Sequence, residues 1–211
     1  MKLQEEWRIK KAYNNWAQTE ETEAEQAGWS GLEDQTSRFE QFLKLEKIKP
    51  FKKASILDVG CGHAALLDFL QARNKTPLKY TGIDLLEEFT KTAKEKHPTA
   101  TIITGNFLKY EFTEKYDFCI ASGIFNVKVS DDPYKILFET LNKMLKLSRK
   151  AIAFNYLKTK EAGKFILTDR MQIHEDEKVI KWCKMRGSTQ HISGYDPFDS
   201  TIIIEKTKNQ P

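Results

Sequence analysis

Two acidic residues and a pair of glycines are the residues of this chain whose types and spacing suggest chemistry. Gly60 and Gly62 follow an apolar run that ends at Val59, Asp58 lies two residues before the first glycine, and Asp84 lies 24 residues after it. Glycines let the backbone turn sharply and let a ligand approach without a Cβ in the way. A carboxylate at position 58 would repel a pyrophosphate but attract a cation, and Asp84 is placed to accept both hydroxyls of a ribose. This pattern predicts a site for a positively charged nucleoside.

Other interpretations of the same residues stay open. The spacing Gly60-x-Gly62-x-x-Ala65 also fits the loose dinucleotide fingerprint, and a ribose-binding acid suits a nicotinamide ligand equally well. Asp58 could instead hydrogen-bond the amides of a turn, and Asp84 could cap the next helix. A nicotinamide-dependent oxidoreductase is therefore the first alternative.

Two further groups of polar residues follow apolar runs. Asn106 and Phe107 follow the run at 100–104, where an amide and an aromatic face could hold an adenine. Ser122 ends the run at 116–122, and Gly123 and Asn126 follow it, on the side of the reactive end of the ligand. Both groups could also be simple turns beside a core side chain.

The elements that must position these residues alternate regularly. Short, almost wholly apolar runs predict parallel strands covered on both faces, at 55–59, 79–84, 100–104, 116–122 and 150–156. Helical patterns are predicted at 34–49, 64–73, 87–96, 133–147 and 175–186. Two last strands, at 189–193 and 201–205, are joined by a short link, so one of them should be antiparallel. The fold class is therefore α/β, with a mostly parallel sheet and helices on both faces.

Composition limits the alternatives. The chain has 211 residues, enough for one domain with a full core, and a net charge of +4 spread over mixed Lys and Glu. This charge makes nucleic acid an unfavoured partner. No run approaches the roughly 20 apolar residues of a membrane helix. Three widely spaced cysteines form neither a metal pattern nor a disulfide framework, which favours a cytoplasmic setting.

At this point the chain resembles the class I S-adenosylmethionine-dependent methyltransferases over about residues 29–206. ILDVGCG at 56–62 is similar to the glycine-rich motif of that family, YTGID at 80–84 to its ribose-binding acid, and GNF at 105–107 to its adenine edge. The resemblance implies a Rossmann-like, seven-stranded sheet with strand order 3-2-1-4-5-7-6 and an antiparallel last strand. It implies S-adenosyl-L-methionine as cofactor and S-adenosyl-L-homocysteine as product. The cofactor-binding residues expected in the strand-end motifs are Asp58, Gly60, Cys61, Gly62, Asp84, Leu85, Asn106, Phe107, Ser122 and Gly123.

A narrower resemblance, to a subgroup of small bacterial methyltransferases, rests on ASGIFNVK at 121–128, AFNYL at 153–157 and an upstream Gly-Trp-Ser. By this similarity Trp29, Gln35 and Arg38 are candidates for the methionine end of the cofactor. Arg38 is expected to pair with the methionine carboxylate.

The chain also departs from the family pattern. Asn106 stands where many members have Asp. The [DN]-PP-[YFW] motif used on exocyclic base amines is absent after the fourth strand, which weighs against methylation of a nucleobase amine. The expected acceptor is a small molecule, with RNA or protein as alternatives, and the protein is expected to be a monomer or homodimer.

A general base, where the acceptor needs one, is expected after the fifth strand. Asn126, His174 and Tyr195 are the catalytic candidates, and the further bases considered are His191, Asp169 and Asp196. Residues 1–50 are expected to form an N-terminal cap and residues 51–211 the methyltransferase domain. Residues 1–30 and 157–174 are long, polar and irregular for a compact domain, which is typical of lids over a substrate.

Overall fold

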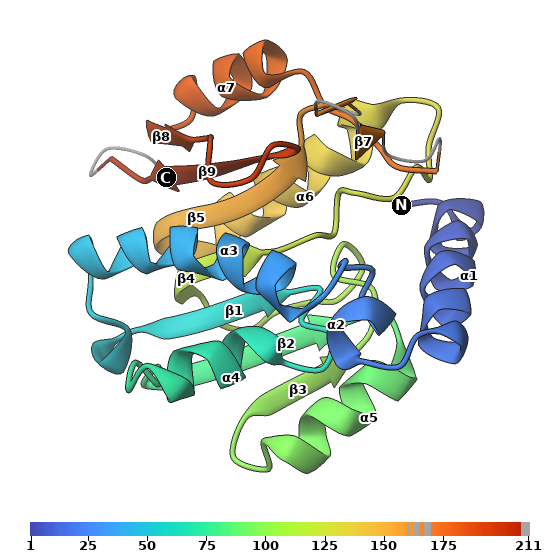
Figure 1. Ribbon diagram of the computed structural model, residues 1–211. Coiled ribbons are helices and arrows are strands. Elements are labelled where there is room, and N and C mark those ends of the chain that lie inside the picture. The colour runs from blue at the N-terminus through green and yellow to red at the C-terminus, as the bar shows by residue number, and fades with distance from the viewer. Residues whose placement is uncertain (160, 163–164, 167–169, 208–211) are drawn as a thin grey trace.

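The computed structural model describes residues 1–159, 161–162, 165–166 and 170–207, and shows a sheet between two layers of helices (Figure 1). The strands of the main sheet are β1 (Ser55–Val59), β2 (Lys79–Asp84), β3 (Thr101–Thr104), β4 (Tyr116–Ala121), β5 (Ser148–Leu157), β8 (Ser188–Ile192) and β9 (Asp199–Glu205). The helices are α1 (Leu3–Thr19), α2 (Glu23–Gln26), α3 (Leu32–Phe42), α4 (Ala65–Ala72), α5 (Glu87–Lys96), α6 (Pro133–Leu147) and α7 (Asp176–Lys184), with short 3-10 turns η1 (Leu43–Lys47) and η2 (Phe51–Lys53). A separate two-stranded pair joins β6 (Glu161–Ala162) to β7 (Phe165–Ile166).

The order of the main sheet is β3-β2-β1-β4-β5-β9-β8. Strands β1 to β5 run parallel, and β9 runs antiparallel to both β5 and β8. The predicted order and the antiparallel last strand are therefore confirmed. In such a sheet the order of connections reverses at β1 and β4, and ligands of open parallel sheets bind at the strand ends beside that point.

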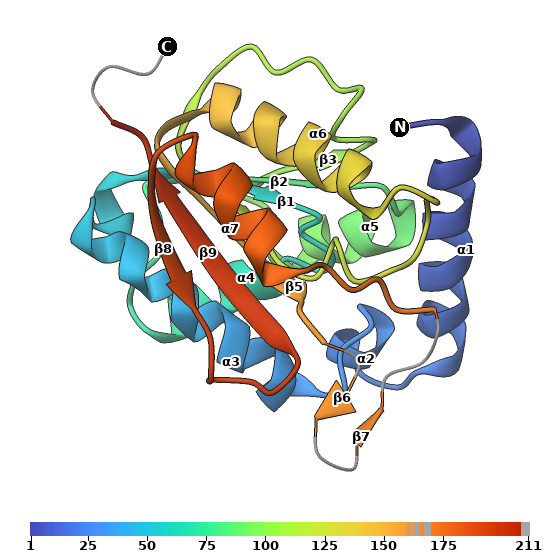
Figure 2. The same ribbon diagram turned by 90° about the horizontal axis from the view of Figure 1, so that it is seen from above.

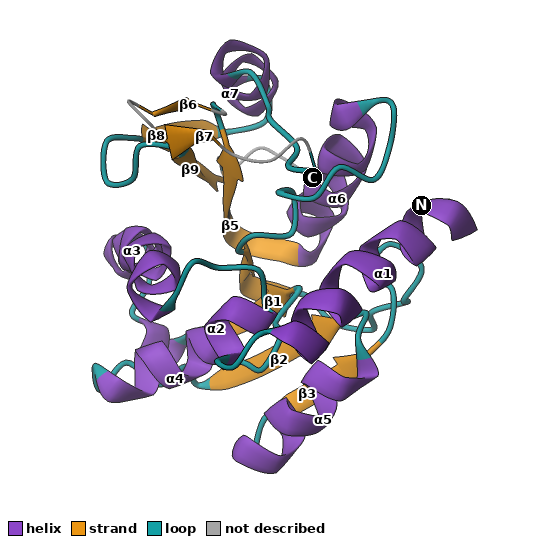
Figure 3. Cartoon of the chain, turned by 45° about the vertical axis from the view of Figure 1, so that its right-hand side comes forward, coloured by secondary structure: helices purple, strands orange, loops and turns teal. Residues whose placement is uncertain are grey.

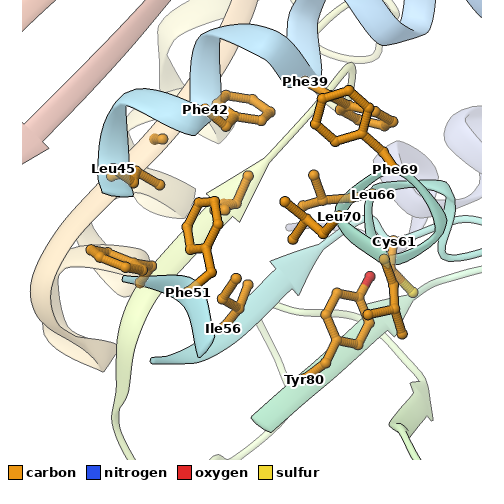
Figure 4. Packing of buried hydrophobic residues seen from close by; sticks show 14 of the residues in the cluster. Phe39, Phe42, Leu45, Phe51, Ile56, Cys61, Leu66, Phe69, Leu70 and Tyr80 are labelled. Carbon is orange, nitrogen blue, oxygen red and sulfur yellow. The ribbon is translucent and has the colours of Figure 1, made fainter. Parts of the chain in front are cut away.

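Successive residues of each strand point to opposite faces, and both faces are buried. Ile56, Phe118 and Ala153 belong to a cluster with α3, α4 and η2, in which the rings of Phe42 and Phe51 lie over the sheet (Figure 4). The intervening residues of the same strands pack with α6 and α7 on the other face. This two-sided burial explains why the strands read as nearly continuous apolar runs.

The predicted bounds of the core elements agree closely with the structure, but the interpretation of residues 1–30 as irregular was wrong. Residues 3–19 form the 17-residue helix α1, which lies across the carboxyl ends of the parallel strands (Figures 1 and 2). In Figure 3, α1 and α2 lie in front of β1, β2 and β3. None of the helices in the described part of the chain is long and apolar enough to cross a bilayer.

Candidate active site

The turn after β1 has backbone angles that suit glycine. Gly60 and Gly62 have φ of +73° and +53°, in the left-handed region where a side chain is strained. The amides of Gly60 and Cys61 both donate to the carbonyl of Ile83, at 2.8 and 3.2 Å, so the turn is fastened to the end of β2. A Cβ on Gly60 would lie 2.1 Å from Cγ2 of Ile124, whereas a Cβ on Gly62 would point into open space. The turn is thus held tightly on one side and open on the other.

Asp58 is a buried carboxylate just below this turn. The hydroxyl of Tyr80 on β2 donates to Oδ2 of Asp58 at 2.5 Å. Burial raises the pKa of Asp58 to about 7, with the Tyr80 hydrogen bond opposing that shift and the charge of Asp84 adding to it. A carboxylate in such surroundings gains stability from a nearby positive charge.

Asp84 ends β2 and faces the same turn. Its Oδ2 accepts from the amide of Gly62 and its Oδ1 from the amide of Leu86, both at 2.9 Å. Burial raises the pKa of Asp84, while these amides act in the opposite direction. Each carboxylate oxygen keeps a lone pair. The side chain therefore shapes the turn and can also accept from two hydroxyls of a ligand.

The end of β3 carries Asn106 and Phe107, and Asn106 contacts helix α1. Nδ2 of Asn106 donates to Oε2 of Glu6 at 3.0 Å, and its Oδ1 accepts from the amide of Leu108 at 3.0 Å. Lys109 also pairs with Glu6, at 2.8 Å. One amide hydrogen and one lone pair of Asn106 remain for a ligand.

The end of β4 is fixed from β5. The amide of Gly123 donates to Oδ1 of Asn155 at 2.8 Å, and Nδ2 of Asn155 donates to Oγ of Ser122 at 3.0 Å. Gly123 has φ of +76°, and a Cβ there would lie 2.6 Å from the ring of Trp29. The hydroxyl of Tyr13 on α1 reaches the carbonyl of Gly123 at 3.5 Å.

These strand ends line one cleft, which encloses about 1120 Å³ of empty space including its open mouth. Its polar lining includes the side chains of Asp58, Asp84, Asn106, Ser122, Gln35, Tyr13, His63 and Thr140. Apolar side chains from α1, α3, α4, α6 and the loop after β4 complete the walls; among them are Ile9, Phe39, Leu66, Ile124 and Ile136. Ten of the twelve residues predicted to bind cofactor line this cleft.

The comparisons with known proteins agree with this geometry. A family model described as a methyltransferase domain matches residues 56–148. A protein of Mycobacterium tuberculosis that is named as a methyltransferase is 33% identical over 162 residues, which cover 72% of this chain and 93% of that protein. The chain belongs to the class I S-adenosylmethionine-dependent methyltransferases.

Solved structures share the fold of this methyltransferase. Magnesium protoporphyrin IX methyltransferase of Synechocystis PCC 6803 with bound SAM superposes with a TM-score of 0.67 at 12% identity, covering 98% of this chain and 99% of that one. Phosphoethanolamine N-methyltransferase 1 of Haemonchus contortus gives a TM-score of 0.73 at 10% identity, covering 98% of this chain and 50% of that one.

The side chains that line the cleft of the methyltransferase suit S-adenosylmethionine as cofactor. S-adenosylmethionine carries a ribose and two positively charged groups. Asp84 presents free lone pairs at the end of β2, and Asp58 lies buried below the neighbouring turn. The open space above Gly62 is where a bulky ligand can approach the backbone.

The structure corrects the expectation for Arg38. This side chain is buried and does not line the cleft, because its guanidinium forms ion pairs with Asp34 of its own helix and with Asp199 of β9. Its Cζ lies 4.7 Å from the centroid of the Trp29 ring, on which it stacks. Arg38 thus packs against Trp29. The positive charge of Arg38 is already neutralised by Asp34 and Asp199, so it is not available to a ligand carboxylate. Gly123, the other predicted binder outside the lining, has its backbone amide bonded to Asn155 and its carbonyl 3.5 Å from the hydroxyl of Tyr13.

The catalytic candidates are likewise not brought to the cleft. Asn126 is buried outside it, and the hydroxyl of Tyr195 lies 2.7 Å from Oγ1 of Thr201 between β8 and β9. His191 lies beside Ser200, and Asp196 beside Arg38. Asp169 lies outside the described residues. Asn126, Tyr195, His191 and Asp196 follow the expected strands, but they are not among the residues that line the cleft.

His174 is turned into the core, with its Nε2 3.3 Å from the carbonyl of Phe125. Burial lowers its pKa to about 4.

The pKa of His174 sets a pH dependence of stability. In the unfolded chain this imidazole has a pKa near its ordinary 6.5 and binds a proton first as pH falls, so the fold loses stability between pH 6.5 and 4. We expect His174 to account for about 2 kcal/mol of lost unfolding free energy at pH 5 relative to pH 7.5. Urea unfolding of H174Q at both pH values should show a loss smaller by that amount, whereas an equal loss in both proteins would refute this assignment.

Some residues that shape the cleft were not predicted from sequence. Tyr80 has no sequence signal that links it to Asp58. Asn155 does have one, since it is the polar residue in the otherwise apolar run 150–156. For the aromatic residues of α1, the sequence does not decide between lining a pocket and packing in the core. The structure places Tyr13 in the cleft and leaves Trp7 exposed.

Proposed function

We propose that this methyltransferase transfers the methyl group of S-adenosylmethionine to a small-molecule acceptor held in the cleft under α1. The observation that carries the proposal is the covered, largely apolar cleft at the ends of β1 to β4, with acidic and amide groups at fixed points of its floor. When bound, S-adenosylmethionine supplies a methyl group already activated by its sulfonium.

The floor of the cleft would hold the nucleoside in a fixed place. Asp84 accepts from the ribose hydroxyls while its other lone pairs hold Gly62 and Leu86. Asp58 provides negative potential under the turn. Phe107 presents an aromatic face at the end of β3, beside the amide hydrogen and the lone pair of Asn106 that remain for a ligand.

The cover would exclude water and align the reactants. Helix α1 contacts the rest of the chain through Glu6, through Arg8, which donates to the carbonyl of Val129 at 3.0 Å, and through Tyr13. Proximity and orientation of this kind contribute up to roughly 7–11 kcal/mol in favourable cases.

The described lining favours an acceptor that attacks without a strong base. Burial and the charge of Asp84 raise the pKa of Tyr13, so its phenol stays protonated. The pKa of His63 is lowered by burial, and its ring packs against that of Phe89 of α5, tilted by 49° with 4.3 Å between the ring centroids. Among the described lining residues, the end of β4 offers Ser122 but no carboxylate or imidazole. A carboxylate, thiolate or enolate acceptor fits this wall.

A small acceptor is supported by the cover and by similar proteins. Two proteins of the same fold are named for magnesium protoporphyrin IX and phosphoethanolamine, which are small molecules.

The test of the acceptor class uses the full chain, methyl-labelled S-adenosylmethionine, and separated small-molecule, RNA and protein fractions of one cell extract. Label should enter the small-molecule fraction. Label in RNA or protein alone would overturn the small-molecule assignment and leave the methyltransferase assignment standing.

The contact between α1 and the end of β3 should slow ligand escape. In E6A, Asn106 and Lys109 both lose their partner on α1, so the lid opens more often. We expect the dissociation rate of S-adenosylhomocysteine to rise about threefold in stopped-flow displacement, since partly exposed ion pairs contribute ~0.2–1 kcal/mol. E21A, on an exposed glutamate before α2, serves as control. An unchanged rate in E6A would show that α1 does not hold the ligand in.

A further inference from the structure

The hydrogen bonds at the end of β4 determine whether the hydroxyl of Ser122 donates or accepts in its bond with Asn155. The backbone amide of Gly123 can only donate, so the atom of Asn155 facing it at 2.8 Å must be Oδ1. The amide nitrogen of Asn155 therefore faces Ser122 and donates to its Oγ at 3.0 Å. Asn155 is fully buried between β4 and β9, so this amide is firmly positioned.

The consequence is a free hydrogen on a cleft-lining hydroxyl. Oγ of Ser122 is an acceptor in the bond with Asn155, and within the described part of the chain its own hydrogen is donated to no group. Ser122 is half-buried and lines the cleft. A partner for this hydrogen must therefore come from a ligand or from solvent.

The strand order indicates which part of the ligand lies there. Asp84 ends β2, and Asn106 and Phe107 follow β3, so the nucleoside is expected at that end of the row. Val59 pairs with Ala121, which places Ser122 directly beside the glycine turn and next in line. A nucleoside over β2 and β3 thus extends its amino-acid tail toward Ser122.

The tail carries a carboxylate, which needs donors away from Asp58 and Asp84. Arg38 is occupied by Asp34 and Asp199 and does not line the cleft. Ser122 presents a neutral O–H donor at the end of β4, on the side of the cleft where the tail is expected.

Building on the proposed function, we propose that Ser122 donates its hydroxyl hydrogen to the tail carboxylate of the methyl donor, and that Asn155 is the positioning residue that directs this hydrogen into the cleft. The pair replaces the arginine that the sequence suggested for this task.

The test compares two ligands by calorimetry on the full chain. S-adenosylhomocysteine has the tail, and 5′-methylthioadenosine has the same nucleoside without it. S122A should weaken S-adenosylhomocysteine about tenfold, the scale of one hydrogen bond to a charged group, and leave 5′-methylthioadenosine unchanged. S122T should retain binding of both, and S188A, on an exposed serine of β8, serves as control.

A double-mutant cycle tests the positioning role of Asn155. In the wild-type background, N155A should lower the affinity for S-adenosylhomocysteine relative to that for 5′-methylthioadenosine. In the S122A background it should leave this ratio of affinities unchanged. Equal losses for both ligands in S122A, no loss for either, or a further change of ratio in the double variant would overturn the inference. A wild-type chain that binds neither ligand would instead refute the proposed function.

Discussion

D84N is expected to weaken binding of S-adenosylhomocysteine about 100-fold. In the wild type both oxygens of Asp84 accept from turn amides at 2.9 Å and keep lone pairs for a ligand. The amide nitrogen of asparagine must face either one of these N–H donors or a ribose hydroxyl that needs an acceptor. The loss of charge-assisted hydrogen bonds amounts to about 3 kcal/mol, which corresponds to about two orders of magnitude in affinity.

Calorimetric titration of D84N beside the wild type measures this loss. D131N makes the same chemical change on an exposed aspartate between β4 and α6, and should bind as the wild type does. Unfolding of each protein without ligand controls for damage to the turn. A folded D84N with affinity within about threefold of the wild type would show that Asp84 serves the turn alone.

G60A is expected to have the second-largest effect, on stability and binding together. The new Cβ would lie 2.1 Å from Cγ2 of Ile124 at a φ of +73°, so the residue must bear both backbone strain and a steric clash. We expect a loss of about 3 kcal/mol in unfolding free energy, from roughly 1–2 kcal/mol of left-handed strain and a similar amount of overpacking. Ligand affinity should fall at least about tenfold, because the turn moves away from Ile83 and Asp84.

The two causes can be separated by matched variants. The double variant G60A/I124A removes the clash and keeps the strain, so it should recover part of the affinity lost in G60A. G194A places a Cβ at a φ of +86° with open space around it, and should show strain without loss of binding. Denaturant unfolding and calorimetry on all three provide the comparison. No recovery in the double variant would contradict the steric part of this explanation.

The sheet and its floor residues could be predicted from sequence because their signals are local. The runs 55–59 and 79–84 have strand bounds that agree with β1 and β2, since buried parallel strands are apolar on both faces. The helix at 133–147 begins at a proline, which suits the first helical position. Once these elements are placed, the carboxyl ends of parallel strands bring Asp84, Asn106 and Ser122 to one edge.

The helical structure of residues 3–19 and the roles of individual side chains could not be predicted in the same way. Helix α1 is polar, and it packs through contacts with residues about 100 or more positions away, such as Asn106, Gly123 and Val129. Arg38 has one partner, Asp34, a single helical turn away, but the ion pair with Asp199 could not be predicted because Asp199 lies 161 residues later. His174 follows β5 as expected for a base, but only packing decides that its ring turns inward.

The central claim is that the cleft at the ends of β1 to β4 binds the sulfonium nucleoside through Asp84. Isothermal titration of S-adenosylmethionine and of NAD into the full wild-type chain, repeated on D84N, tests it most directly. We expect one site for S-adenosylmethionine in the wild type, a strongly weakened one in D84N, and no heat with NAD. Heat with NAD alone, or S-adenosylmethionine binding that D84N leaves unchanged, would contradict it.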